Sequence, residues 1–223
     1  MTRNELEHKP AEYYEQQRLD LLPYIPVSCR KILDCGCGYG LLGAALKARA
    51  PCRVLGVEKE AQAAAEARKR LDSVWQQDAE QPLAESGFDC IVYADVLEHL
   101  VNPWGTLRSH VSALLAPGGY VVMSIPNVRQ FTVAYMLFGR GRWRYSESGI
   151  MDRTHLRFFT LKDIKEMIHA AGLYIDAVAA NREPWTWKTV LVRLSMGWLF
   201  PDCLTVQWIV RGRRPQQEGT GPE

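Results

Sequence analysis

The stretch from Ile32 to Gly43 constrains the fold of this chain more than any other. Its sequence, I-L-D-C-G-C-G-Y-G-L-L-G, places four glycines directly after a short apolar run. The run predicts a buried strand, and the residues that follow, to about Arg49, predict a helix. Glycine tolerates positive φ and lets a ligand approach the backbone, while the N–H groups at a helix start attract negative charge. This strand, turn and helix therefore predict a ligand cradle at the end of a strand.

Short apolar runs alternate with helical patterns along the chain. This spacing is typical of β–α–β units, which form a parallel sheet through right-handed crossovers. We therefore expect an α/β fold with a Rossmann-like, doubly wound sheet of seven strands, mostly parallel with an antiparallel last strand. The strands are expected at 31–35, 53–58, 74–78, 88–93, 120–125, 173–179 and 205–211. The helices are expected near 10–22, 41–49, 61–71, 104–115, 127–138 and 161–171.

Length and composition fit a single domain at 1–215, followed by a disordered tail at 216–223. The chain has 223 residues, of which 47% are hydrophobic and 23% charged, as in soluble globular proteins. A net charge of +2 gives no reason to expect a nucleic-acid partner. The six cysteines lack metal or disulfide spacing, the first residues are polar, and no apolar run is long enough to cross a bilayer. We therefore expect a reduced, cytoplasmic protein without a metal site or a transmembrane segment.

The segment 128–159 departs from the alternating pattern. It is long and largely irregular, which is typical of a lid or a binding loop. Four aromatic side chains in it offer flat faces to an acceptor: Tyr135, Trp143, Tyr145 and Phe158. Three arginines either hold a phosphate or carboxylate of the acceptor or form an exposed basic loop: Arg140, Arg142 and Arg144.

A second unusual segment, 185–203, is apolar and aromatic and predicts a helical insertion. One interpretation is that this helix covers the core. The other is that residues 185–200 contact a membrane surface from one side.

Two cofactor classes fit the glycine stretch. The glycines from Gly38 to Gly43 satisfy the G-x-G-x-x-G pattern of dinucleotide-binding proteins, with Glu58 at the distance of a ribose-binding acid. Gly36, however, opens an earlier G-x-G-x-G that follows Asp34, and this acid is not part of the dinucleotide pattern.

The order of further motifs resembles that of class I S-adenosylmethionine-dependent methyltransferases of types 11 and 23. The motifs are D-C-G-C-G-Y-G at 34–40, G-V-E at 56–58, D-A-E at 78–80, F-D-C-I at 88–91, D-V-L-E-H-L at 95–100, L-A-P-G-G at 115–119 and P-N at 126–127. Tyr13, Tyr14, Arg18 and the segment 149–160 are similar to methyltransferases of ubiquinone synthesis and to those encoded beside glycan-building enzymes.

The resemblance implies S-adenosylmethionine as cofactor and S-adenosylhomocysteine (SAH) as product. It implies methyl transfer to oxygen on a small molecule or on a glycan- or lipid-linked intermediate. Transfer to nitrogen or carbon is an alternative within the family. A regulatory or assembly protein that binds the cofactor without turnover, and a dinucleotide oxidoreductase, are alternatives of other classes.

The resemblance also implies roles for residues at the start of the cradle. The methionine part of the cofactor is expected against the backbone of Gly36, Cys37, Gly38 and Gly40. Arg18 either holds the methionine carboxylate or is an exposed helix residue. Asp34 is expected to orient the loop.

Further roles follow at the ends of later strands. Glu58, with Lys59 beside it, is expected to accept hydrogen bonds from the two ribose hydroxyls, because a carboxylate has two acceptor oxygens and no donor. Asp78 and Ala79 are expected at the adenine. The sulfonium is expected beside Ala94, Asp95 and Val96.

A hydroxyl acceptor must lose its proton as it is methylated, and histidine is the side chain best suited to this near neutral pH. His155, in the irregular segment, is the first candidate for a base or an acceptor contact, with Asp152 to orient it; the alternative is a structural hydrogen-bonding role. His99, directly after the fourth strand, is the second candidate or orients the loop. The other three histidines are expected at the surface: His8, His110 and His169.

Overall fold

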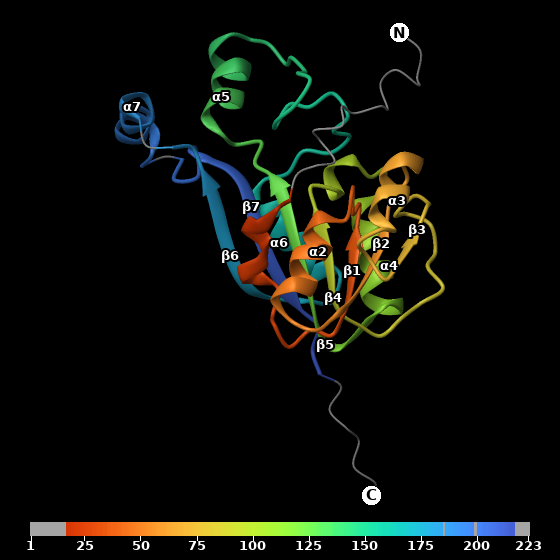
Figure 1. Ribbon diagram of the computed structural model, residues 1–223. Coiled ribbons are helices and arrows are strands. Elements are labelled where there is room, and N and C mark those ends of the chain that lie inside the picture. Colours follow the sequence, from red (N-terminus) through yellow and green to blue (C-terminus); the bar gives the residue numbers. More distant parts are fainter. Residues whose placement is uncertain (1–16, 185, 199, 217–223) are drawn as a thin grey trace, which may run out of the picture.

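The protein is described by a computed structural model that covers residues 17–184, 186–198 and 200–216 (Figure 1). In these residues, seven strands form one sheet: β1 (Lys31–Cys35), β2 (Arg53–Val57), β3 (Ser73–Trp75), β4 (Phe88–Ala94), β5 (Leu115–Pro126), β6 (Tyr174–Arg182) and β7 (Thr205–Arg213). Their order is β3-β2-β1-β4-β5-β7-β6, and β7 runs antiparallel to both of its neighbours. The other neighbouring pairs are parallel. The predicted Rossmann-like sheet with an antiparallel last strand is confirmed.

Two hydrophobic cores lie on the two faces of the sheet. Successive side chains of a strand point to opposite faces, so Ile32 of β1 joins one core and Leu33 joins the other. Helices α2 (Leu41–Arg49) and α3 (Ala61–Ala67) pack on the first face, and α4 (Pro103–Ala113) and α6 (Leu161–Ala170) pack on the second. Because both faces are covered, β1 and β4 carry apolar residues in succession, at Ile32 and Leu33 and from Cys90 to Ala94, rather than in an alternating pattern.

The prediction of a helix near 10–22 is wrong for the part of it that the structure describes. Residues 10–16 lie outside the described residues, and Leu19–Tyr24 forms a short 3-10 helix, η2. Arg18 has a left-handed backbone with φ of 44°, and Pro23 inside η2 lacks the N–H that a continuing helix needs. Both features prevent a longer α-helix. Most of the predicted tail, 217–223, also lies outside the described residues.

The helix predicted at 127–138 begins later than expected. It consists of α5 (Phe131–Ala134), followed by a π-helical turn, η4 (Tyr135–Gly139). Asn127 is fully buried and donates to the carbonyls of Asp202 and Thr205, so it anchors the end of β5 instead of starting a helix. Between η4 and α6, the described chain is irregular apart from isolated bridges and turns.

The apolar insertion 185–203 contains α7 (Trp187–Met196), which stands away from the sheet (Figure 1). The prediction that this helix covers the core is wrong, because Leu194 is 76% exposed. The faces of β6 and β7 are already covered by η2 on one side and α6 on the other. No helix in the described part of the chain has the length and apolar character needed to cross a membrane.

Candidate functional site

A cavity of about 590 Å³ opens at the carboxyl ends of β1, β2, β3 and β4. Ligands of open parallel sheets bind at this edge, and the volume suits a cofactor-sized molecule. All residues predicted for the cofactor except Gly40 line it: Arg18, Asp34, Gly36, Cys37, Gly38, Glu58, Lys59, Asp78, Ala79, Ala94, Asp95 and Val96. Residues that were not predicted also line it: Leu42, Val57, Gln77, Glu80, Leu100, Val101, Arg153, Thr154 and Leu156.

The glycine loop forms the floor of the cavity with its backbone. Gly36, Gly38 and Gly40 all have positive φ, at 68°, 52° and 75°, which glycine adopts without strain. The N–H of Gly36 donates to the carbonyl of Val57 at 2.7 Å, which holds the loop against the end of β2. A Cβ on Gly36 would lie 2.5 Å from Val96 Cγ2, so only glycine fits between the loop and the residues after β4. Gly40 instead caps α2 and packs against α3.

Glu58 is buried at the end of β2, and its carboxylate faces backbone donors from two sides. Its Oε2 accepts from Gly38 N at 3.0 Å, and its Oε1 accepts from Glu60 N at 2.9 Å. Each carboxylate oxygen offers a second lone pair, so both oxygens can accept one more hydrogen bond. Burial raises the pKa of Glu58 in spite of these backbone bonds. A ligand with two adjacent hydroxyl donors fits this arrangement.

Asp34, the last but one residue of β1, is a second buried acid in the cavity. Its side chain is 2% exposed, and burial, with a contribution from the charge of Glu58, raises its pKa to about 7. A large fraction of Asp34 is therefore protonated near neutral pH, and only part of the population carries a charge beside Glu58.

The Asp34→Asn substitution is expected to flatten part of the pH dependence of stability. Because the folded pKa is raised, the native state retains this proton at pH values where the unfolded chain has lost it. The contribution of Asp34 is fully present below pH 4 and is lost as pH rises to about 7. The Asn variant should therefore gain stability over the wild type across that window, by roughly 4 kcal/mol at about 1.4 kcal/mol for each pKa unit.

Chemical denaturation at several pH values measures this gain. Asp72→Asn is the matched control, because the pKa of Asp72 is shifted in the opposite direction. Partial burial acts to raise this pKa, but the hydrogen bond from the Val54 N–H and the charge of Lys47 lower it overall. Its stability difference from the wild type should stay constant between about pH 5 and 7. If the Asp34→Asn difference is equally constant, Asp34 does not bind a proton there.

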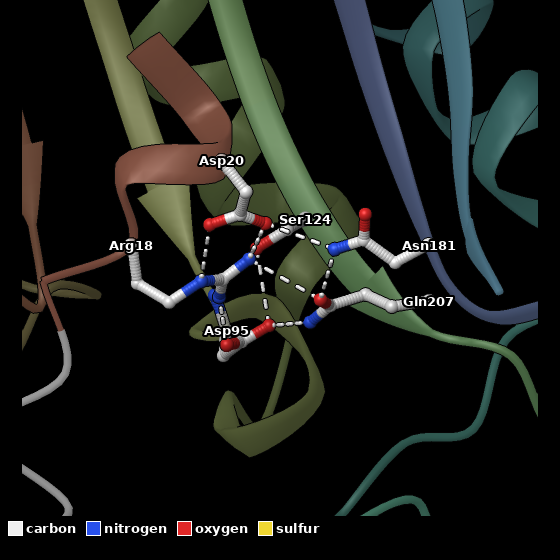
Figure 2. Close-up of polar contacts among 6 residues, drawn as sticks. All are labelled: Arg18, Asp20, Asp95, Ser124, Asn181 and Gln207. Atoms are coloured by element: carbon white, nitrogen blue, oxygen red, sulfur yellow. Dashed lines mark hydrogen bonds and ion pairs between the residues drawn. The ribbon is translucent and has the colours of Figure 1, made fainter. Parts of the chain in front are cut away.

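Arg18 lies at the centre of a polar network that Figure 2 shows. It forms an ion pair with Asp95 and donates to Asp20 at 3.1 Å and to Gln207 Oε1 at 3.2 Å. Its side chain is 12% exposed, so the alternative of an exposed helix arginine is wrong. Although burial acts against its charge, the carboxylates of Asp95 and Asp20 raise the pKa of Arg18.

Asp95 connects this network to the sheet. It has a φ of 57°, a left-handed backbone that is uncommon outside glycine. Its Oδ1 accepts from Ser124 Oγ at 3.0 Å and from the Gln207 amide, and burial raises the pKa of its carboxyl in spite of Arg18. The network therefore fixes the turn after β4 against β5 and β7, at the place where the cavity opens.

Glu98, His99 and His155 come together at one side of the cavity. Their carboxylate and imidazole atoms lie within 4.8 Å of one another, and the two imidazole rings are 4.7 Å apart in an edge-to-face arrangement. His99 lines the cavity, whereas His155 lies buried behind it. Side chains of this kind bind metal ions as well as protons. We expected no metal site from the sequence, because the spacing of these residues along the chain does not indicate that they lie close together.

The hydrogen bonds around His99 determine which of its nitrogens can take a proton. Its Nδ1 lies 3.1 Å from the carbonyl of Thr154, which only accepts, so Nδ1 carries the hydrogen. Thr154 is itself held by Asp152, whose Oδ1 accepts from the Thr154 hydroxyl at 2.7 Å and from its N–H at 2.8 Å. Asp152 thus holds Thr154 against His99, and in the neutral imidazole Nε2 carries the lone pair. The Nδ1 of His155 bonds to the Ile150 carbonyl at 2.9 Å in the same way.

The remaining histidines lie outside the cavity lining where they are described. His169 is exposed on α6, as predicted. The prediction of a surface position for His110 is wrong: it is 4% exposed, and its Nδ1 lies 2.7 Å from the Tyr93 hydroxyl. Burial lowers the pKa of His110 to about 4. His8 lies outside the described residues.

The predicted lid, 128–159, contributes to the main cavity and to a second, shallower hollow. Arg153 lines both, and Tyr145 and Arg144 line the second only. Trp143 packs edge-to-face on Phe158 at 5.1 Å, and neither lines these two cavities. Arg153 is thus shared by the two cavities.

Comparison with known proteins agrees with this geometry. A profile described as "Methyltransferase domain" matches residues 6–178. A protein of Xylella fastidiosa named ubiquinone biosynthesis O-methyltransferase is 31% identical over 192 residues, covering 79% of this chain and 75% of the relative. Magnesium protoporphyrin IX methyltransferase from Synechocystis, solved with bound SAH, is similar at a TM-score of 0.61 and 14% identity, covering 92% of this chain and 83% of that one. An S-adenosylmethionine-dependent methyltransferase from Mesorhizobium loti is similar at a TM-score of 0.62 and 19% identity, covering 92% of this chain and 98% of that one.

Proposed function

The chain belongs to the methyltransferase-domain family and is an S-adenosylmethionine-dependent methyltransferase, and from this premise we propose that it methylates an oxygen atom. The acceptor is a small molecule or a glycan- or lipid-linked intermediate. One observation carries the choice of oxygen: His99 stands on the cavity wall with Nδ1–H bonded to Thr154, so that Nε2 can take a proton. The name of the Xylella fastidiosa relative, an O-methyltransferase, supports the same choice.

When bound, S-adenosylmethionine supplies a methyl group on a positively charged sulfur, and the thioether that leaves is neutral. Glu58 would accept from the ribose hydroxyls with the lone pairs that Gly38 and Glu60 leave available. Asp78 and Ala79 would contact the adenine, and the loop from Gly36 to Gly40 would pack against the methionine part.

Arg18 and Asp95 are assigned to positioning. Arg18 already holds Asp95 and Asp20, so a bound carboxylate would have to replace one of them at the guanidinium. The network keeps the residues from Ala94 to Val96 at the mouth of the cavity, where the methyl group is expected.

His99 would take the hydroxyl proton at Nε2 as the acceptor oxygen is methylated. Asp152 and Thr154 keep Nδ1 protonated and the ring in place, and the carboxylate of Glu98 lies close enough to stabilise the imidazolium that forms. His155 is assigned to supporting His99 from behind. Holding acceptor, methyl and sulfur in line contributes the larger part of the rate enhancement.

Paired acceptors test the proposal. The protein is incubated with S-adenosylmethionine labelled at its methyl group and with phenols, catechols and sugars, each beside the amine that replaces its hydroxyl. We expect label on the hydroxyl compounds and not on their amine partners. Label on the amines alone would contradict O-methylation, and SAH binding without label on any acceptor, including a small-molecule and lipid extract of cells, would favour a non-catalytic binding protein.

A further inference from the structure

Helix α7 presents its apolar side to the outside instead of to the protein. Leu191 and Leu194 of α7 are 59% and 76% exposed and lie at helical spacing, so they share one stripe. Trp198, two residues after the end of α7, is 78% exposed. Thr189, on the other side, is 6% exposed and bonds to the carbonyl of Pro184. A surface helix of a globular protein normally has the opposite pattern, so the stripe needs a covering that the described chain does not supply.

A second exposed apolar group lies on η4 and the residues after it. Phe138 is 86% exposed and Tyr135 is 62% exposed. Trp143 and Tyr145, further along the irregular segment, are 42% and 47% exposed. Aromatic residues dominate this group, and aromatic side chains are enriched where apolar and aqueous phases meet.

Contacts near the start of α5 and after α7 connect the two segments that carry these exposed groups. Phe131 N, at the start of α5, donates to Cys203 O at 2.8 Å. Arg129 pairs with Asp202 at 3.3 Å and lies over the ring of Phe200. Figure 1 shows α5 and α7 standing beyond the arrowheads of β5 and β6, the same end of the sheet at which the cavity opens.

Positive charge is concentrated on these two segments. Residues 135–145 and 186–200 hold five of the chain's 27 Lys and Arg residues and none of its 25 Asp and Glu residues. Arg140, Arg142 and Arg144 are all exposed. The rest of the chain therefore carries a net negative charge, and the exposed apolar surface coincides with its basic part.

We propose that α7 and residues 135–145 form a docking surface for the face of an anionic lipid bilayer. An anionic surface complements the five cations, whereas a second copy of the chain would bring like charges together. α7 has ten residues, about 15 Å in length, so it lies along the interface and does not enter the roughly 30 Å hydrocarbon core end-on. The docked protein would turn its cavity mouth toward the bilayer and receive an acceptor from it.

Flotation with vesicles tests the docking surface. The protein is mixed with vesicles of phosphatidylglycerol and phosphatidylcholine, or of phosphatidylcholine alone, at low and high salt. We expect binding to the anionic vesicles that weakens at high salt. The Leu194→Ser/Trp198→Ser variant should lower the partition coefficient more than tenfold, because two apolar side chains no longer enter the interface. Replacing Arg140, Arg142 and Arg144 by Gln should lower it about 100-fold, at about fivefold for each cation.

The control variant is Val27→Ser, which removes an apolar side chain of comparable exposure, 60%, from the turn before β1. It should bind vesicles as the wild type does, and all variants should retain wild-type affinity for SAH, which shows that they are folded. Absence of vesicle binding by the wild type overturns the proposal. Concentration-dependent self-association that Leu194→Ser/Trp198→Ser abolishes, without vesicle binding, overturns it in favour of a second copy as the occupant.

Discussion

His99→Ala is expected to lower the turnover number about 100- to 10,000-fold, the usual contribution of a general base. The reason is that the variant lacks the imidazole that Thr154 and Asp152 hold at the cavity wall. Without it, no group takes the proton of the acceptor hydroxyl. The affinity for SAH should change little, because the proposed function gives His99 no contact with the cofactor. Single-turnover measurements with the best acceptor, together with calorimetric titration of SAH, separate the two quantities.

His169→Ala is the matched control, because it removes an imidazole that is exposed on α6. It should leave turnover unchanged. His155→Ala should have a smaller effect than His99→Ala, since His155 lies behind the wall. Wild-type turnover in His99→Ala would contradict its role as base. Loss of activity on chelation, restored by a divalent cation, would assign the Glu98, His99 and His155 cluster to a metal ion instead.

Glu58→Ala should weaken cofactor binding by one or two charged hydrogen bonds, at about 1.5–3 kcal/mol each. One such bond corresponds to a loss of affinity of about tenfold to 100-fold. The carboxylate also holds Gly38 N and Glu60 N, so the variant loosens the glycine loop in addition. Titration calorimetry with SAH measures the loss.

Two further variants separate these contributions. Glu58→Gln keeps the length of the side chain but turns an NH₂ toward a donor, and it should bind SAH with an affinity between those of the wild type and Glu58→Ala. Glu66→Ala removes a partly exposed carboxylate that pairs with Lys69 outside the cavity, and it should bind normally. Unchanged affinity in Glu58→Ala would refute the ribose assignment.

The sheet could be predicted from the sequence because local patterns determine it. Strands β1 and β4 are buried on both faces and carry successive apolar residues, and the glycines after β1 mark positive φ directly. Glu58 and Asp78 could be placed in the cavity because carboxyl ends of parallel strands meet at one edge. Each of these inferences needs only the neighbouring residues.

Other features depend on contacts between distant residues and could not be predicted. Nothing near His110 in the sequence indicates that it lies under Tyr93, and nothing near His99 indicates that Thr154 fixes its tautomer. Helical spacing in α7 predicts an apolar stripe but not whether core, bilayer or solvent faces it. The network of Arg18 could not be predicted for the same reason, since its three acceptors, Asp20, Asp95 and Gln207, come from separate parts of the fold.

The most direct test is a crystal structure of the complex with SAH. We predict that the ribose hydroxyls donate to both oxygens of Glu58, that the adenine amino group lies at Asp78, and that His99 faces the open side of the sulfur. A cofactor bound elsewhere, or bound in this cavity with Glu58 turned away from the ribose, would contradict the account.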